Sequence, residues 1–163
     1  NIVFYCVPFT ELQEALRDNC PEELFTVLMR RLMVKIANRI CAANDYGAII
    51  TGESVAQVAS QTLPAIFCTN AAAEYPVFRP VIGMDKREIV DVARHIDTFE
   101  VSTLPYEDCC TVFSPKHPKT RPSLEEILAA EASFDFEPLI EKAVRETEVK
   151  QFKYGVRNVD LDM

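Results

Sequence analysis

The sequence contains no tryptophan, four glycines and two histidines among 163 residues. It lacks any apolar run near the roughly 20 residues that span a bilayer, and its first residues show neither a basic region nor a signal cleavage site. Its six cysteines include no CxxC pair and no regular spacing, which argues against a zinc site or a disulfide framework. We therefore expect a cytoplasmic protein with no metal site among these residues and no contact with a membrane.

Positive charge is also scarce. Seventeen Lys and Arg residues face 25 Asp and Glu residues, so the formal net charge is −8. Coats for nucleic acids or membranes need a cationic surface, which this composition does not provide. One basic concentration, Lys116, Lys119 and Arg121, leaves room for a local contact with an RNA backbone. At 48% hydrophobic and 26% charged residues, the composition is typical of one soluble globular domain.

Hydrophobic periodicity predicts alternating strands and helices over the first hundred residues. We expect a buried strand at 2–7 and further strands at 48–51 and 76–82. The helices are expected at the capping box 10–13, over 24–40, over 55–63, after the capping box 85–88, from 123, and over 138–149. This alternation favours an α/β fold with a parallel sheet.

Two adjacent arginines, Arg30 and Arg31, lie within the long apolar helix predicted for 24–40. An unpaired cation is costly to bury, so each side chain must reach solvent, a carboxylate or a phosphate. Snorkelling of the side chain at the helix edge is the default interpretation.

A Thr51-Gly52-Glu53-Ser54 turn follows the strand predicted at 48–51. Parallel sheets bind ligands at the carboxyl ends of their strands, and a glycine there lets a ligand approach the backbone. A plain turn with Ser54 as the N-cap explains the same pattern. Gln57 and Gln61 lie four residues apart and are expected on one face of the next helix.

Residues 104–122 contain four prolines and no helical period, which predicts a long and functional loop. Its adjacent cysteines, Cys109 and Cys110, cannot readily form a disulfide with each other. Nearby cations favour a reactive thiolate, whereas the preceding Glu107 and Asp108 oppose it. Packing of one or both thiols beneath the loop is the alternative.

Several of these segments, taken in order, resemble the tRNA 4-thiouridine synthetases, also called tRNA uracil 4-sulfurtransferases. The matching segments are 7–10, 29–33, 51–63 with its TGESxxQVASQTL string, 79–86 and 104–110. The resemblance implies a PP-loop ATP pyrophosphatase domain with an adenine nucleotide α-hydrolase-like α/β fold. Residues 1–163 would form its carboxyl-terminal portion, and 104–122 its cysteine-bearing loop.

The resemblance also implies a reaction, in which ATP with Mg²⁺ adenylates O4 of a tRNA uridine. A cysteine persulfide, charged by a cysteine desulfurase, then delivers sulfur to C4, releases AMP and leaves 4-thiouridine. By position, Arg30, Gly52 and Gln61 match nucleotide-binding residues of the family. The persulfide cysteine is Cys110 or Cys109: Cys110 fits the C-x-V-x-S pattern and is favoured, whereas Cys109 fits the spacing from the preceding helix. The family is also linked to thiazole formation in thiamine biosynthesis.

The sequence departs from the family pattern in its glycines. The SGGxDS loop that holds the ATP phosphates is absent, because the four glycines include no Gly-Gly pair. Ala56 stands where the family usually has glycine, which is expected to tighten the helix predicted at 55–63. The family's amino-terminal RNA-binding region, the main tRNA contact, is also missing.

These departures predict a domain truncated at its amino-terminal side and inactive alone. An incomplete sheet would expose an edge and an apolar face, which favours a homodimer. Two other functions fit less well: a non-catalytic nucleotide- or partner-binding module or split subunit, and a related PP-loop thiolase acting at another tRNA position.

Overall fold

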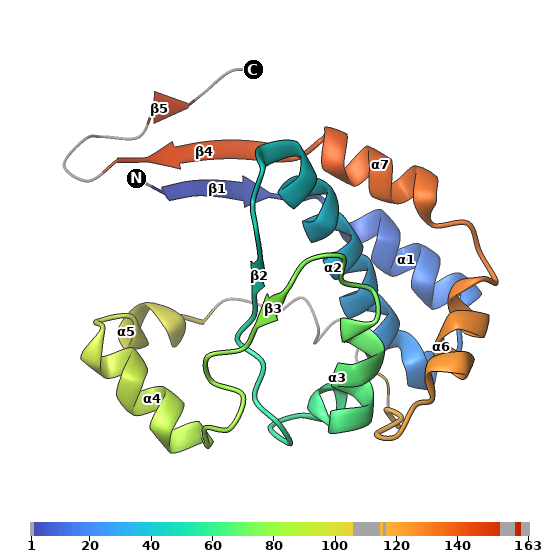
Figure 1. Ribbon diagram of the computed structural model, residues 1–163, viewed down its shortest axis with the longest axis horizontal. Coiled ribbons are helices and arrows are strands. Elements are labelled where there is room, and N and C mark those ends of the chain that lie inside the picture. The colour runs from blue at the N-terminus through green and yellow to red at the C-terminus, as the bar shows by residue number, and fades with distance from the viewer. Residues whose placement is uncertain (1, 106–114, 116, 154–158, 161–163) are drawn as a thin grey trace.

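The computed structural model describes residues 2–105, 115, 117–153 and 159–160 (Figure 1). Its strands are β1 (Ile2–Cys6), β2 (Ile49–Ile50), β3 (Val77–Phe78), β4 (Glu148–Phe152) and β5 (Val159–Asp160). Its α-helices are α1 (Thr10–Asn19), α2 (Phe25–Asn44), α3 (Leu63–Asn70), α4 (Lys86–His95), α5 (Phe99–Ser102), α6 (Leu124–Glu131) and α7 (Glu137–Arg145). Short 3₁₀ helices cover Glu22–Leu24 and Ala59–Gln61. The fold is mixed α/β.

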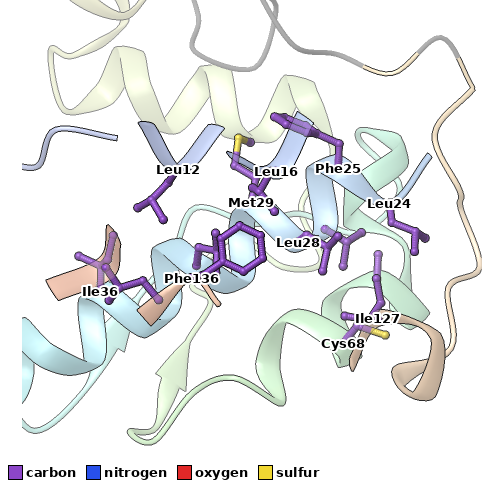
Figure 2. Packing of buried hydrophobic residues seen from close by; sticks show 14 of the residues in the cluster. Leu12, Leu16, Leu24, Phe25, Leu28, Met29, Ile36, Cys68, Ile127 and Phe136 are labelled. Carbon is purple, nitrogen blue, oxygen red and sulfur yellow. The ribbon is translucent and has the colours of Figure 1, made fainter. Parts of the chain in front are cut away.

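Helix α2 is the centre of the molecule, and α1, α3, α6 and α7 all contact it (Figure 1). Its side chains at four-residue spacing, Leu28, Leu32 and Ile36, are buried in a core that Figure 2 shows from close by. Leu12 and Leu16 from α1, Ile127 from α6 and Ile140 from α7 complete this core. The prediction of a long, largely buried helix is therefore confirmed.

In the described part of the chain, the strands form two small sheets rather than one parallel sheet. β2 and β3 pair in parallel, with Ile49 opposite Val77, whereas β1, β4 and β5 form an antiparallel sheet in the order β1-β4-β5. The strand predicted at 2–7 forms as β1, but its predicted burial is wrong, because Ile2 is 68% exposed and Phe4 is 51% exposed. A short apolar run has the same sequence pattern whether or not another element covers the strand.

The helix predicted over 55–63 is also absent. Residues 55–58 form a turn, the 3₁₀ helix follows, and α3 begins only at Leu63. Ala56 has φ = 65°, a left-handed conformation that a right-handed helix cannot contain. Gln57 and Gln61 therefore do not share a helix face, and Ala56 does not tighten a helix.

Helix starts were predicted with mixed success. The capping box is present at α4, where Asp85 accepts from the Glu88 backbone N–H and Glu88 accepts from the Asp85 N–H. Ser123 caps α6 by accepting from the Glu126 N–H. At α1 the expected box does not form, because the helix begins at Thr10 itself after Phe9.

Helices α4 and α5 contact each other and lie away from the α1, α6 and α7 group in Figure 1. Neither contains a buried residue. The parts of 104–122 that the structure describes contain no strand or helix. Among the described residues, no helix combines the length and the apolar character needed to cross a membrane.

Candidate functional site

A cavity of about 650 Å³ lies beside α2, at the carboxyl ends of β2 and β3. One part of its wall is apolar and includes Met29, Met33 and Ile49. Another part is polar and includes Arg30, Glu53 and Arg79. This volume falls within the range of small-molecule sites, and an apolar wall with a few polar groups is typical of them.

Glu53 is the centre of the polar wall. Its side chain is only 2% exposed, and three neighbouring side chains donate hydrogen bonds to its carboxylate. Arg30 Nη2 lies 2.5 Å from Glu53 Oε1, and Arg79 Nε lies 2.6 Å from Oε2. The Thr51 hydroxyl also donates to Oε2 at 2.9 Å. The carboxylate thus connects α2, the turn after β2 and the segment after β3.

The pKa of Glu53 is lowered from its ordinary value. Burial alone would raise this pKa, but the hydrogen bond from Arg79 and the charge of Arg30 outweigh it, with help from the Thr51 hydroxyl. Glu53 is therefore ionised at neutral pH, and the three charged side chains leave the cavity wall with one net positive charge.

Hydrogen bonds hold the turn that follows Glu53 in a fixed shape. The Ser54 backbone N–H donates to the Gln61 side-chain Oε1 at 2.9 Å, and the Ser54 hydroxyl donates to the Met84 carbonyl at 2.6 Å. The Ala56 N–H donates to the Gln61 carbonyl at 3.0 Å. Gln61, which lines the cavity, is therefore positioned by the turn that it closes.

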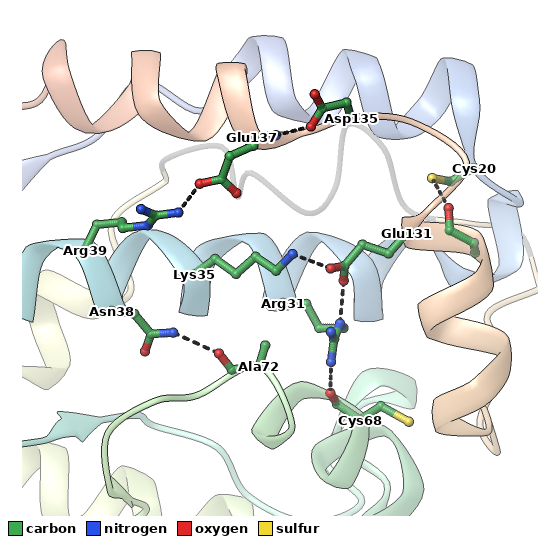
Figure 3. Close-up of polar contacts among 11 residues, drawn as sticks. Cys20, Arg31, Lys35, Asn38, Arg39, Cys68, Ala72, Glu131, Asp135 and Glu137 are labelled. Carbon is green, nitrogen blue, oxygen red and sulfur yellow. Dashed lines mark hydrogen bonds and ion pairs between the residues drawn. The ribbon is translucent and has the colours of Figure 1, made fainter.

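The two adjacent arginines face different partners, and each reaches a carboxylate. Snorkelling, the default interpretation, is wrong for Arg31, because its side chain is buried against Glu131. Arg31 is 3% exposed and donates to Glu131 Oε2 and to the Cys68 carbonyl, each at 2.6 Å (Figure 3). Lys35 contacts the other oxygen of Glu131. Arg31 thus connects α2 to α6 and α3, whereas Arg30 faces the cavity.

The structure brings two of the three predicted nucleotide-binding residues directly to the cavity, Arg30 and Gln61. Gly52 lies between the lining residues Thr51 and Glu53, and apart from these chain neighbours no described residue has an atom within 4 Å of the place where its Cβ would be. Cys109 and Cys110 lie outside the described residues. Within the described part of the chain, no group of three His, Cys, Asp or Glu side chains is placed to hold a metal ion, and Mg²⁺ stays a prediction.

The end of the 104–122 segment lies against the cavity and is anchored there. Pro115 and Pro118 both line the cavity. The Lys119 N–H donates to the Glu23 carbonyl at 3.0 Å, and the Thr62 hydroxyl donates to the Thr120 carbonyl at 2.6 Å. Side-chain ion pairs with Glu126 and Glu23 compensate the charge of Lys119, which weakens the case for an RNA contact at this side chain.

Sequence reasoning missed the central role of Glu53 and Arg79. Both belong to segments singled out above, but Glu53 was interpreted only as part of a turn. Arg30 and Arg79 lie 23 and 26 residues from Glu53 in the sequence, so no local sequence pattern connects the three side chains. The one available signal was a charged residue shortly after a short apolar strand. Residues at that position lie at the carboxyl edge of a parallel sheet, where ligands bind.

Residues 1–136 match the family model described as thiamine biosynthesis protein (ThiI). The chain belongs to the ThiI family. Over 148 residues it is 54% identical to a probable tRNA sulfurtransferase of Acetivibrio thermocellus, covering 91% of this chain and 38% of the relative. A probable tRNA sulfurtransferase of Caldanaerobacter subterraneus is 53% identical over 84% of this chain and 36% of its own length.

A solved structure has the same fold as this chain. The crystal structure of a 4-thiouridine synthetase–RNA complex with bound ATP superposes with a TM-score of 0.84 at 35% identity. The match covers 90% of this chain and 38% of that one. The chain therefore spans about two fifths of the length of these ThiI relatives.

Proposed function

We propose that this chain supplies the carboxyl-terminal part of the catalytic domain of a tRNA uracil 4-sulfurtransferase. In this proposal the domain has a PP-loop, adenine nucleotide α-hydrolase-like fold and contributes residues that bind ATP and accept sulfur. Membership of the ThiI family supports the proposal, as does the ATP named with the solved relative. A link to thiazole formation in thiamine biosynthesis is part of the same proposal.

The main support for the proposal is Arg30 on the cavity wall, because its side chain has a buried polar atom without a partner. Arg30 Nε is buried and has no hydrogen-bond acceptor among the described residues. A buried donor without an acceptor is costly, so the described residues do not fully satisfy this Arg30 side chain, and a ligand that draws the guanidinium group toward the cavity would supply acceptors for it. The net positive charge of the wall and the apolar face of Met29 and Met33 fit an anionic nucleotide with a flat base.

The anchored end of the 104–122 segment supports a sulfur-accepting cysteine near this cavity. Cys110 precedes the cavity-lining Pro115 by five residues. Covalent geometry alone limits that separation to about 18 Å between Cα atoms. We propose Cys110 as the persulfide carrier, with Cys109 as the alternative.

The proposed reaction divides the chemistry between ATP and the cysteine. Adenylation makes O4 of the uracil a leaving group, because C4 is otherwise a poor electrophile. The terminal sulfur of the persulfide then bonds to C4 as the C4–O4 bond breaks and AMP departs with that oxygen, which leaves a disulfide between the cysteine and the uridine sulfur. A second thiol, such as the free cysteine supplied with the desulfurase, then attacks the sulfur of the enzyme's cysteine. The S–S bond breaks, 4-thiouridine departs and a mixed disulfide remains on the enzyme. Arg30, Gly52 and Gln61 would hold the nucleotide, and a cysteine desulfurase would supply the sulfur.

The test uses the full-length protein that contains this chain, incubated with a cysteine desulfurase, cysteine, ATP, Mg²⁺ and tRNA. Mass spectrometry locates the sulfur adduct, and nucleoside analysis measures 4-thiouridine. We expect Cys110→Ser to abolish both, and Cys109→Ser to retain them. The exposed Cys6 offers a matched control, so Cys6→Ser is expected to behave like the parent protein.

Loss of both signals in Cys109→Ser with retention in Cys110→Ser would move the role to Cys109. A double serine variant that still carries the adduct and forms 4-thiouridine would contradict the proposal. Thiolation at another tRNA position would favour the related PP-loop thiolase.

A non-catalytic nucleotide- or partner-binding module or split subunit is the second candidate. Calorimetric titration of the 163-residue chain with ATP separates the two. A catalytic part that needs a phosphate loop from elsewhere should bind ATP weakly or not at all. Micromolar binding by the chain alone would favour the module.

A further inference from the structure

Glu53 is the buried carboxylate that lies between the two cavity arginines. Arg30 comes from α2, and Arg79 follows β3, so two cations from distant parts of the chain meet at one side chain. Each is largely removed from solvent, with 22% and 14% of its side chain exposed. Without the carboxylate, the two guanidinium groups would repel each other in a partly desolvated wall.

The two arginines are not held equally. Arg79 donates Nε to Glu53 and Nη1 to Asn70 Oδ1 at 3.1 Å, so two partners fix its guanidinium group. For Arg30, the described residues provide one anchoring contact, from Nη2 to Glu53, while its Nε has no acceptor. The orientation of Arg30 in the cavity wall therefore depends on Glu53.

We infer that Glu53 is a positioning residue for ATP binding: it holds the Arg30 guanidinium group at the cavity wall, where the group meets an acceptor on the nucleotide. Arg79 and Asn70 in turn hold Glu53 from the other side. This inference rests on the proposed function, because it assigns the ligand of Arg30. Glu53 acts through Arg30 and does not itself contact the nucleotide.

The chain contains a matched control for a purely structural role. Glu131 also bridges two cations, Arg31 and Lys35, also reaches α2, and is 11% exposed. It lies outside the set of residues that line the cavity. A loss of packing or charge pairing at α2 should therefore affect Glu131→Gln and Glu53→Gln alike, whereas a loss of ATP positioning should affect only the latter.

The experiment measures the dissociation constant of ATP and KM for ATP and for tRNA in the full-length protein. The variants are Glu53→Gln, Glu131→Gln, Arg30→Gln and the double variant Glu53→Gln/Arg30→Gln. We expect Glu53→Gln to raise the ATP constant by roughly tenfold or more, because a charge-assisted contact is lost, with KM for tRNA unchanged. Glu131→Gln should leave the ATP constant unchanged.

The ATP dissociation constant of the double variant shows whether Glu53 acts through Arg30. If Glu53 acts through Arg30, adding Glu53→Gln to Arg30→Gln should weaken ATP binding no further. Independent effects that multiply would overturn the inference, as would equal losses in Glu53→Gln and Glu131→Gln. Where Glu53→Gln does not fold, Glu53→Asp carries the test, since a shorter side chain cannot reach both arginines. Its expected effect is a smaller loss in the same direction, and an unchanged ATP constant would overturn the inference.

ATP binding by the parent protein and the positioning role of Glu53 can be tested separately. A parent protein that does not bind ATP contradicts the proposed function itself. A parent protein that binds ATP, with Glu53→Gln binding equally well, removes only the positioning role.

Discussion

Ala56 shows how one residue can conflict with the local backbone. Its φ of 65° lies in the left-handed region, where a Cβ atom is unfavourable. Its side chain is exposed, so the methyl group gains little from burial. The resemblance to the family implies glycine at this position, and the backbone conformation gives that preference a physical reason.

Ala56→Gly should therefore stabilise the chain slightly or leave it unchanged. Relief of the left-handed strain is worth about 1–2 kcal/mol, and the added freedom of the unfolded chain offsets about 0.4–1 kcal/mol of it. Urea unfolding of the 163-residue chain measures the difference. Ala42→Gly, at an exposed position of α2, is the control and should destabilise by about 1 kcal/mol. A loss of stability in Ala56→Gly as large as in the control would contradict this account.

Helix α2 is the element on which the core and the site both depend. One side packs Leu28, Leu32 and Ile36 into the core, and its Arg30 reaches the cavity. Figure 3 shows the further polar contacts of Arg31, Asn38 and Arg39 with neighbouring segments. Displacement of α2 would therefore change packing and ligand contacts together.

Leu28→Ala should destabilise the chain by about 3 kcal/mol, within the usual range for a buried leucine. Leu28 is fully buried between α2 and its neighbours, so truncation leaves a cavity. Thermal and urea unfolding measure the loss. Leu128→Ala in α6 is a control, since Leu128 is 47% exposed, and it should cost much less. Equal losses in the two variants would contradict the assignment of the core.

The sequence predicted elements that have a long local pattern and missed elements that depend on a distant partner. The four-residue spacing of Leu24, Leu28, Leu32 and Ile36 is a long signal, and α2 follows it. By contrast, β4 was missed, because the expected last helix over 138–149 extends into its first residues. Strand β4 depends on pairing with β1, which is adjacent in space but far away in the sequence, so its own residues do not reveal it.

The cavity was predicted only in part for a similar reason. The resemblance to the family singled out Arg30, Gly52 and Gln61, because each belongs to a segment that matches the family pattern, and their role in nucleotide binding stays a prediction. The joining of Arg30 to Glu53 and Arg79 is a tertiary contact across 23 and 26 residues, and no local propensity encodes it. The turn at 55–58 was mistaken for a helix because its composition alone does not reveal a left-handed residue.

At the scale of the whole molecule, two largely buried carboxylates, Glu53 and Glu131, make stability depend on pH. Burial alone would raise the pKa of Glu131, but the hydrogen bonds from Arg31 and Lys35 outweigh it and lower that pKa. The pKa of Glu53 is lowered in the same sense. A carboxyl group with a lowered folded-state pKa stabilises the fold above its ordinary pKa, and this contribution disappears as pH falls through the folded-state value.

We therefore expect the free energy of unfolding to fall as pH decreases below about 4.5, near the ordinary pKa of glutamate. Glu53→Gln and Glu131→Gln should each lower stability at neutral pH and flatten this acid-side dependence. Urea unfolding at a series of pH values measures the slope. The exposed Glu125 serves as a control, and Glu125→Gln should leave the slope unchanged. An unaltered slope in both buried variants would contradict the pairing described for Glu53 and Glu131.

The pairing of β1 with β4 has a consequence for synthesis on the ribosome. Ile2 lies opposite Phe152, so the first strand emerges about 145 residues before its partner is made. At ordinary translation speeds this delay is on the order of ten seconds. During that time Ile2, Val3 and Phe4 cannot pair with β4, their partner in the described structure, so we expect this apolar segment to be available to nascent-chain chaperones.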